Sequence, residues 1–181
     1  MSRCYLFIGP SGSGKTTLAD SCFSLEQKII SYTTRPKRSG EKDEVDYHFV
    51  SKEVFEEMIQ AEAFAEYDRY DHHYYGIAKI SIQRALEKGD CYDPITMPGF
   101  WNLRRSFGST VVPVLIDVSK ETIHQRLKKR QAPQEEITRR LELFTEEQKR
   151  YPELEKLPDL IKIDGEQPLK AMIQQLKQHL C

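Results

Sequence analysis

The sequence lacks three features that would each point to a particular class of protein. Its four cysteines include no CxxC pair, so neither a zinc site nor a disulfide framework is indicated. No stretch approaches the roughly 18 apolar residues of a membrane span, and no signal peptide precedes the first apolar segment. The formal net charge is −1, which argues against a nucleic-acid binder that relies on bulk charge. We expect a globular cytoplasmic protein, a monomer or a homodimer, that binds neither membrane nor nucleic acid.

The N-terminal part of the chain contains a phosphate-binding loop (P-loop) pattern. Residues 9–17 read Gly-Pro-Ser-Gly-Ser-Gly-Lys-Thr-Thr, with four residues between the first glycine and Gly-Lys-Thr. The apolar run at 4–8 predicts a buried strand before the loop, and 17–22 predicts a helix after it. Glycines let successive backbone N–H groups face a phosphate, and the helix N-terminus adds partial positive charge.

This pattern predicts a nucleoside triphosphate site. Lys15 can reach the β- and γ-phosphates, and the Thr16 hydroxyl can ligate Mg²⁺. Thr16 is the one metal ligand that we expect. The residues expected to hold the triphosphate are Gly9, Ser11, Gly12, Ser13, Gly14, Lys15, Thr16 and Thr17.

Beyond the loop, predicted strands alternate with predicted helices. The strands are expected at 28–32, 47–50, 64–67, 74–77, 91–95, 111–118 and 160–163. The helices are expected at 51–59, 80–88, 101–107, 119–130, 135–150 and 168–180. Pro94 weakens the strand at 91–95 because proline removes a ladder donor, and Pro113 marks the entry to the strand at 111–118. The alternation predicts an α/β fold with a mainly parallel sheet flanked by helices.

A second group of functional residue types lies at 31–49. It reads Ser31-Tyr32-Thr33-Thr34-Arg35-Pro36-Lys37-Arg38-Ser39-Gly40-Glu41, with Tyr47-His48-Phe49 after it. Taken alone, Arg35, Arg38 and Glu41 are equally consistent with a phosphate-binding site and with surface salt bridges. Together with Glu66, Tyr74-Tyr75-Gly76 and three later arginines, however, the segment closely resembles the monophosphate site of guanylate kinases. The resemblance runs from Cys4 to about Ile163.

The resemblance implies a P-loop kinase fold in one domain, 1–181. Its expected parts are a core (1–30, 80–125 and 150–181), a small mixed monophosphate-binding lobe (31–79) and a helical lid (126–149). It implies phosphorylation of GMP, and of dGMP, by ATP with Mg²⁺. The implied GMP-binding residues are Ser31, Arg35, Arg38, Glu41, Tyr47, Glu66 and Tyr75. The implied catalytic residues are Lys15, Arg38, Arg130 and Arg140.

The chemistry of these side chains suits the implied roles. Arginine forks pair bidentately with phosphate, so Arg35 and Arg38, with the hydroxyls of Tyr47 and Tyr75, are expected to clamp the 5′-phosphate of GMP. Glu66 is expected to accept hydrogen bonds from N1–H and N2–H₂ of guanine. Adenine lacks that pair of donors, so one buried carboxylate can carry much of the choice of base.

Three arginines fit the lid of the family. Arg126 and Arg130 are spaced i to i+4 on a predicted helix, so they share one face, and Arg140 lies on the next helix. If residues 126–149 swing over the site, they bring positive charge and exclude water. For Arg126, a role in the lid and an ion pair with an acid such as Glu135 or Glu136 are equally consistent with the sequence.

The chain departs from the family after the lobe. Guanylate kinases usually carry Asp-x-Asp before a glycine that Gly99 matches, and those two positions are Pro94 and Thr96 here. Asp93 lies one residue early, and a shift of one residue along a strand turns a side chain to the opposite face. The loss of both acids predicts weaker catalysis.

Two further departures concern the bases. Ile77 replaces a Ser or Thr that donates to guanine, and Asp164 stands where an asparagine is common near the ATP base. Two other functions therefore remain open: a kinase of the same fold that acts on another phosphorylated acceptor, such as ribose 1,5-bisphosphate, and a non-catalytic binding module. Glu66 argues against the kinase with another acceptor, and the intact Lys15 and Thr16 argue against the non-catalytic module.

Overall fold

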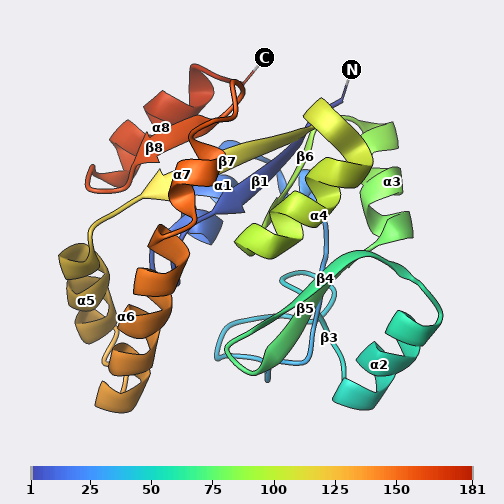
Figure 1. The fold of residues 1–181 in the computed structure, drawn as a ribbon, viewed down its shortest axis with the longest axis horizontal. Helices are drawn as coiled ribbons and strands as arrows, with labels where there is room; N and C mark the ends of the chain where they lie inside the picture. The colour runs from blue at the N-terminus through green and yellow to red at the C-terminus, as the bar shows by residue number, and fades with distance from the viewer. Residues whose placement is uncertain (1, 181) are drawn as a thin grey trace. The chain divides into compact units, whose positions relative to one another are not determined.

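A computed structural model describes residues 2–180, so Met1 and Cys181, the two ends of the expected domain, lie outside the described residues (Figure 1). The chain forms two compact units. Among the described residues, the first unit comprises 2–6 and 23–111, and the second comprises 7–22 and 112–180. Within residues 2–180 no helix combines the length and the apolar character that crossing a membrane requires.

The parallel sheet that the sequence predicts is present, with the strand order β6-β1-β7-β8. Its strands are β1 (Cys4–Ile8), β6 (Cys91–Pro94), β7 (Val111–Asp117) and β8 (Ile161–Asp164). β1 is buried along its whole length, as expected for an apolar run in the centre of an α/β sheet. β6 is an edge strand, which tolerates Pro94. Pro113 immediately precedes Val114, the first residue of β7 that pairs with β8.

A second sheet lies wholly within the first unit, with the order β3-β2-β5-β4. Its strands are β2 (Tyr32–Thr33), β3 (His48–Phe49), β4 (Phe64–Tyr70) and β5 (His73–Ala78). β2 runs parallel to β3 and antiparallel to β5, and β4 runs antiparallel to β5. The expectation of a small mixed sheet is therefore confirmed.

The helices of the first unit follow amphipathic segments of the sequence. They are α2 (Lys52–Gln60), α3 (Lys79–Lys88) and α4 (Met97–Phe107), with short helical turns at Leu25–Gln27 and Gly108–Thr110. Ser51 caps α2 by accepting a hydrogen bond from the N–H of Val54 at 3.3 Å. Phe55 is fully buried, and its ring stacks on Phe64 with 4.4 Å between centroids. This packing anchors α2 against the second sheet.

The second unit contains the helices that follow β1, β7 and β8. They are α1 (Lys15–Cys22), α5 (Lys120–Lys129), α6 (Gln134–Gln148), α7 (Tyr151–Leu154) and α8 (Leu169–Lys177). Figure 1 shows α5 and α6 side by side. Ile123 and Leu127 of α5 pack with Ile137 and Phe144 of α6 in one buried cluster. This shared apolar core holds α5 and α6 together.

Three expectations about elements need correction. The strand expected at 28–32 does not form: Lys28 makes one isolated bridge to Tyr92, and the strand begins at Tyr32. α4 begins at Met97, not at 101, because Thr96 caps it by accepting from the N–H of Gly99 at 3.2 Å. Arg130 is the residue after α5 and so lies outside the helix that was expected to carry it. The division into core, lobe and lid stays a prediction.

Candidate active site

The P-loop pattern forms the turn between β1 and α1, the context that it requires. The N–H of Ser13 donates to the carbonyl of Pro10 at 3.0 Å, and the N–H of Leu18 donates to that of Gly14 at 2.9 Å. Gly12 and Gly14 have φ angles of 87° and 97°, which side chains with a Cβ rarely tolerate. The glycine spacing is therefore explained by the backbone of the loop.

Lys15 folds back onto this loop. Its Nζ donates to the carbonyl of Gly9 at 2.5 Å and to that of Pro10 at 3.0 Å. The pKa of Lys15 is lowered to about 8, mainly by burial; the charge of Glu147 opposes this shift, and the charge of Arg140 adds to it. At neutral pH the ammonium remains mostly charged, next to neutral carbonyl oxygens that a phosphate could replace.

Arg126 holds the loop to the turn after β8. Its guanidinium donates to the carbonyl of Ser13 at 3.0 Å and to that of Gly165 at 2.7 Å, with a longer contact of 3.5 Å to Gly12. The sequence left open whether Arg126 belongs to a lid or pairs with surface acids. In the structure it bonds backbone carbonyls, a role that the sequence did not predict.

The other two lid arginines are placed differently from each other. Arg140 of α6 donates to Ser11 Oγ and forms an ion pair with Glu136 at 2.6 Å, and its side chain is 11% exposed. Arg130 is exposed at the C-terminal end of α5. Of the three arginines, Arg126 and Arg140 therefore contact the loop in this conformation.

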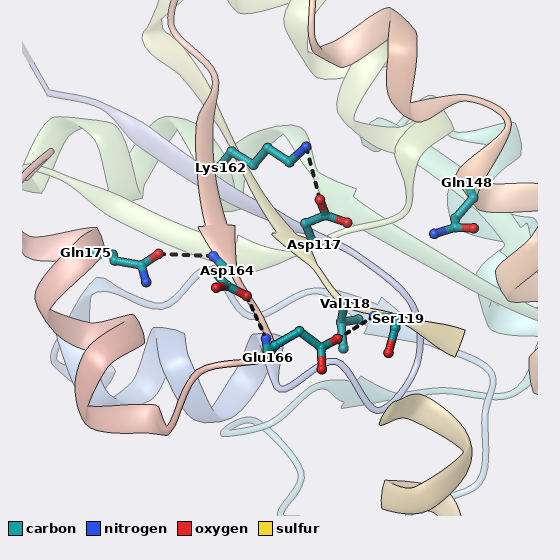
Figure 2. Close-up of a pocket in the computed structure, with 8 residues that line it drawn as sticks. All are labelled: Asp117, Val118, Ser119, Gln148, Lys162, Asp164, Glu166 and Gln175. Carbon is teal, nitrogen blue, oxygen red and sulfur yellow. Dashed lines mark hydrogen bonds and ion pairs between the residues drawn. The ribbon is translucent and has the colours of Figure 1, made fainter. Parts of the chain in front are cut away.

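A groove of about 520 Å³ opens in the second unit at the carboxyl ends of β7 and β8 (Figure 2). It is lined by Asp117, Val118, Ser119, Gln148, Lys162, Asp164, Glu166 and Gln175. Asp164 Oδ1 accepts from the N–H of Glu166 at 2.9 Å, and Oδ2 accepts from Gln167 Nε2 at 3.0 Å. Glu166 in turn accepts from the N–H of Ser119 and from Thr122 Oγ1, both at 2.6 Å. Asp164 and Glu166 thus fasten the turn before α8.

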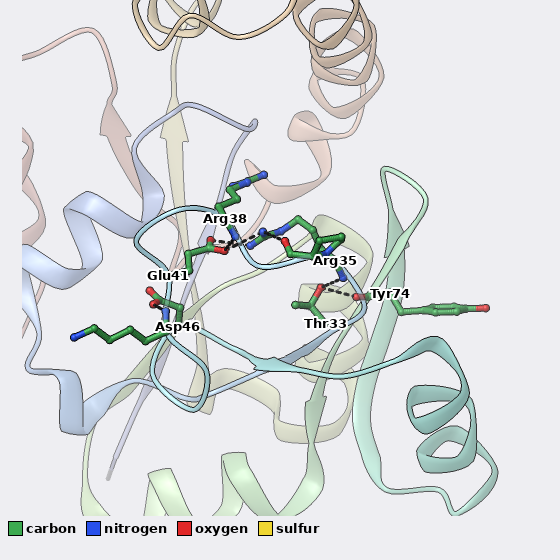
Figure 3. Close-up of polar contacts among 8 residues, drawn as sticks. Thr33, Arg35, Arg38, Glu41, Asp46 and Tyr74 are labelled. Carbon is green, nitrogen blue, oxygen red and sulfur yellow. Dashed lines mark hydrogen bonds and ion pairs between the residues drawn. The ribbon is translucent and has the colours of Figure 1, made fainter.

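In the first unit, Arg35 and Glu41 form a two-pronged ion pair (Figure 3). The two guanidinium nitrogens of Arg35 lie 3.0 and 2.8 Å from the two carboxylate oxygens of Glu41. The N–H of Arg38 donates to the same carboxylate at 2.7 Å. Burial alone would raise the pKa of Glu41, but the hydrogen bonds from Arg35 and Arg38 outweigh it and hold the pKa below its ordinary value. Glu41 therefore fixes both arginine positions in one loop.

Aromatic rings complete the surroundings of Arg35. Its guanidinium carbon lies 5.6 Å from the ring centroid of Tyr47 and 5.7 Å from that of Phe49, within the range of cation–π contact. The rings of Tyr47 and Tyr75 are 6.0 Å apart. Burial, and then the charge of Asp93, raise the pKa of Tyr47, so its hydroxyl remains a neutral donor. Four of the sequence-predicted monophosphate residues, Arg35, Glu41, Tyr47 and Tyr75, are thus brought together.

Two threonines that the sequence analysis passed over hold this loop to β5. Thr33 Oγ1 donates to the carbonyl of Tyr74 at 2.9 Å and accepts from the N–H of Arg35 at 3.2 Å. The N–H of Tyr74 donates to Thr34 Oγ1 at 2.9 Å. The signal in the sequence was the Thr-Thr pair at the end of a predicted strand. Ser31, two residues earlier, is buried, and its carbonyl accepts from the N–H of His48 at 2.8 Å.

Glu66 of β4 is a buried acid, only 6% exposed. Burial is the main cause that raises its pKa to about 8, followed by the charges of Asp93 and Asp68. The backbone N–H of Ile77 donates to the carboxylate and acts in the opposite direction. Ile77 therefore still supplies a backbone donor at a position where its side chain supplies none.

The carboxylate of Glu66 lies against the first turn of α4. A Cβ added to Gly99 would come within 2.5 Å of Glu66 Oε2, so a side chain at this position would displace the acid. Asp93 is 1% exposed, and its charge acts on both Glu66 and Tyr47. The expectation that Asp93 lies on the opposite face of the strand from positions 94 and 96 stays a prediction.

Residues that could hold a metal are few. Among residues 2–180 there is no group of three or more His, Cys, Asp or Glu side chains arranged to hold an ion. Thr16 is exposed in the first turn of α1, directly after the loop. A single hydroxyl suits Mg²⁺, which keeps several waters and binds through phosphates as well as protein oxygens.

Comparisons with known proteins agree with this geometry. The family model for guanylate kinases matches residues 1–180. The guanylate kinase of Methylococcus capsulatus is 37% identical over 158 residues, 84% of this chain and 78% of that one. The guanylate kinase of Buchnera aphidicola is 33% identical over 193 residues, 100% of this chain and 91% of that one.

A solved structure supports the fold. The crystal structure of guanylate kinase from Anaplasma phagocytophilum matches with a TM-score of 0.72 over 98% of this chain and 83% of that chain, at 20% identity. A P-loop turn, a mixed sheet that carries the Arg35–Glu41 pair, and these matches together lead to one conclusion: the chain belongs to the guanylate kinase family.

Proposed function

We propose that this protein transfers the γ-phosphoryl group of ATP to GMP, or to dGMP, and releases ADP and GDP or dGDP. The single observation that carries the proposal is Glu66, a carboxylate that is buried beside Gly99 and on which the charges of two acids act. A buried acid of this kind needs donors, and the Watson–Crick edge of guanine offers two. The relatives named guanylate kinase support the same reaction.

On the donor side, the loop residues from Gly9 to Thr17 would hold the phosphates of ATP. The turn leaves backbone N–H groups at the start of α1 for this purpose. Lys15 would exchange the carbonyls of Gly9 and Pro10 for phosphate oxygens, which are stronger acceptors because they are charged. Thr16 would ligate Mg²⁺, which when bound neutralises phosphate charge.

On the acceptor side, Arg35 and Arg38 would bind the 5′-phosphate of GMP, with the hydroxyls of Tyr47 and Tyr75 as further donors. Glu41 prepares this site, because it fixes the fork of Arg35 and the backbone of Arg38 before any ligand arrives. Ser31 would donate near the base.

The charge that develops during transfer would be neutralised by Lys15, Arg38, Arg130 and Arg140. Arg140 already contacts Ser11 of the loop. Arg130 is exposed and would approach only when the lid segment 126–149 closes, which would also exclude water. This lid, the lobe at 31–79 and the remaining core are the functional parts that we propose.

The setting of the reaction follows from its chemistry. Conversion of GMP to GDP is a step of purine nucleotide metabolism. The free thiols of Cys4, Cys22 and Cys91 suit a reducing cytoplasm. We propose that the protein acts there as a monomer or a homodimer on small nucleotides, with no nucleic-acid or membrane partner.

A coupled assay tests the proposal. ADP formation from ATP would be followed with GMP, dGMP, AMP, UMP, CMP and ribose 1,5-bisphosphate as acceptors, each at millimolar concentration. We expect turnover with GMP and dGMP and at least 100-fold lower kcat/KM with AMP, on the order of what one buried acid can discriminate. No turnover of either guanine nucleotide would refute the proposal. Turnover of ribose 1,5-bisphosphate alone would identify the other kinase.

Calorimetry with ATP tests the remaining alternative. Lys15 and Thr16 are intact, so we expect the protein to bind ATP with Mg²⁺ and to lose this binding in Lys15→Met. A protein that binds neither ATP nor GMP would be a non-catalytic module.

A further inference from the structure

Hydrogen bonds from two adjacent threonines join the end of β2 to one residue of β5, Tyr74. Thr33 Oγ1 donates to the carbonyl of Tyr74 at 2.9 Å, and the N–H of Thr34 donates to the same oxygen at 3.1 Å. In return the N–H of Tyr74 donates to Thr34 Oγ1 at 2.9 Å. Both polar backbone groups of Tyr74 are therefore held by this pair, which we call the threonine clasp (Thr33 and Thr34).

The clasp extends the pairing of β2 with β5 past the end of the strand. β2 is only two residues long, and its last residue, Thr33, pairs with Tyr75 in the antiparallel ladder. At the next position the side-chain hydroxyl of Thr34, in place of its backbone carbonyl, accepts the N–H of Tyr74. The chain can therefore leave the sheet at Thr34 while Tyr74 keeps its hydrogen bonds.

The hydroxyl of Thr33 has a second partner, the backbone of Arg35. It accepts from the N–H of Arg35 at 3.2 Å while it donates to the carbonyl of Tyr74 (Figure 3). A hydroxyl can do both, because it has one hydrogen to donate and lone pairs to accept. Thr33 is 0% exposed, so water has no access to replace either bond. One buried oxygen atom thus links Arg35 to β5.

The two ends of this link carry candidate phosphate ligands. The ring of Tyr74 stacks on Phe55 with 5.1 Å between centroids, so Tyr75, the next side chain along β5, turns to the other face of the sheet. There its ring lies 6.0 Å from that of Tyr47, which lies 5.6 Å from the guanidinium carbon of Arg35. The clasp therefore fixes the spacing between Arg35 and Tyr75.

We propose that Thr33 and Thr34 are positioning residues of the monophosphate site: their hydroxyls set the spacing of Arg35 and Tyr75, and so raise the affinity for the 5′-phosphate of the acceptor. The inference rests on the proposed function, because it takes Arg35 and Tyr75 as ligands of the phosphate of GMP. The threonines act through these two residues and not on the ligand.

The proposal separates the phosphate from the base. Thr33→Val keeps the β-branched shape but removes the hydroxyl, so the N–H of Arg35 loses its acceptor in a buried place. Arg35 then moves relative to Tyr75, and a fork that must match a phosphate is sensitive to such a shift. Guanosine carries the same base without the phosphate. Its binding should therefore be insensitive to the clasp.

Binding of GMP and of guanosine to the full chain tests this separation. In Thr33→Val we expect the Kd for GMP, measured by calorimetry, to rise about tenfold, the size of one lost hydrogen bond. The inhibition constant of guanosine as a competitor of GMP should stay within twofold, and so should KM for ATP. Thr33→Ser restores the hydroxyl and should restore the affinity for GMP. Ser51→Ala, which removes the hydroxyl that caps α2 in the same unit, is the control and should leave both constants unchanged.

A double-mutant cycle tests whether Thr33 acts through Arg35. A lysine at position 35 presents a flexible point charge in place of a fork, so its exact placement matters less. In the Arg35→Lys background, Thr33→Val should therefore raise the Kd for GMP by no more than about threefold, in place of tenfold. A further tenfold rise would show that Thr33 acts independently of Arg35 and would overturn the inference.

Two other results would overturn it as well. The first is a wild-type Kd for GMP in a folded Thr33→Val. The second is an equal loss of GMP and guanosine binding, which would indicate a general loosening of the sheet. If Thr33→Val does not fold, Thr34→Val decides: it removes the acceptor of the Tyr74 N–H and should weaken GMP about threefold without affecting guanosine. Each of these failures leaves the proposed function standing, whereas a wild-type protein that binds no GMP would refute both.

Discussion

The phosphate loop at 9–17 and the lobe that we propose at 31–79 hold their charged side chains in different ways. In the loop, Lys15 and Arg126 donate to backbone carbonyls. In the lobe, Arg35 is paired with a carboxylate, and Glu66 is buried among groups that oppose its charge. The proposed ATP site is thus built from backbone geometry, whereas in the proposed GMP site charged side chains act on one another. Substitutions should therefore have separable effects in the two regions.

The largest effect is expected at Lys15. Replacement by Met removes the cation that would reach the transferred phosphate, so kcat should fall by roughly 1,000-fold. Affinity for GMP should stay within twofold, since Lys15 donates to carbonyls of the phosphate loop. The coupled assay and GMP calorimetry measure the two quantities. Lys149→Met, which breaks an exposed pair with Glu146, is the control and should leave both unchanged. Equal loss of GMP binding in Lys15→Met would contradict the separation of the regions.

The next effect concerns Arg35. Lysine keeps the charge but loses the fork to Glu41 and the stacking on Tyr47, so KM for GMP should rise about 10- to 100-fold. KM for ATP should hardly change. Steady-state kinetics with each nucleotide varied in turn measure both. Arg69→Lys, an exposed position on β4, serves as the control. A rise in KM for ATP instead of GMP would contradict the separation of effects between the two regions.

Substitution of Arg126 should instead raise KM for ATP and leave KM for GMP unchanged, and the rise should be smaller than the one expected for Arg35. A lysine at this position cannot bond the carbonyls of Ser13 and Gly165 together, so the loop loses an attachment and KM for ATP should rise about tenfold. KM for GMP should remain near the wild-type value. Lys129→Gln on the exposed face of α5 is a suitable control. If Arg126→Lys has wild-type kinetics, the hydrogen bonds from Arg126 to the loop do not contribute to ATP binding.

The smallest effect is on stability. Glu41→Gln should lower the free energy of unfolding by about 1–3 kcal/mol at pH 7, the range for hydrogen bonds to a charged group. The folded-state pKa of Glu41 is below its ordinary value, so its contribution is present above the unfolded pKa and is lost as the pH falls through the folded one. Urea unfolding at pH 7, 5 and 3.5 should show the variant approaching wild type at the lowest pH. Glu56→Gln, from an exposed pair with Lys52, should show no difference at any of them.

Much of the phosphate loop could be predicted because its information is local. The spacing of Gly9, Gly14 and Lys15 and the apolar run before them suffice to give a strand, a loop and a helix. The pair Arg35 and Glu41 was also accessible, because the two residues belong to one short segment whose residue types match a known family. The alternation of apolar segments gave the parallel sheet for the same reason.

What the sequence could not give depends on distant segments. Arg126 meets Ser13 across 113 residues of chain and Gly165 across 39, so no local pattern predicts those bonds. The segment at 28–32 has a strand-like composition, but its Lys28 forms an isolated bridge to Tyr92 rather than a ladder, and tertiary context overrides propensity. Glu66 and Asp93 lie on different strands, β4 and β6, so no local pattern predicts that the charge of Asp93 acts on Glu66.

The central claim is that one buried acid, Glu66, selects the acceptor base. The most direct measurement is kcat/KM for GMP and for AMP in the wild-type protein and in Glu66→Gln, at pH 8.5, where the acid is mostly ionised. A glutamine keeps the shape but offers one acceptor and one donor in place of two acceptors. We expect kcat/KM for GMP to fall about 100-fold and the preference over AMP to shrink by a similar factor. An unchanged preference for GMP in a folded, active Glu66→Gln protein would contradict the account.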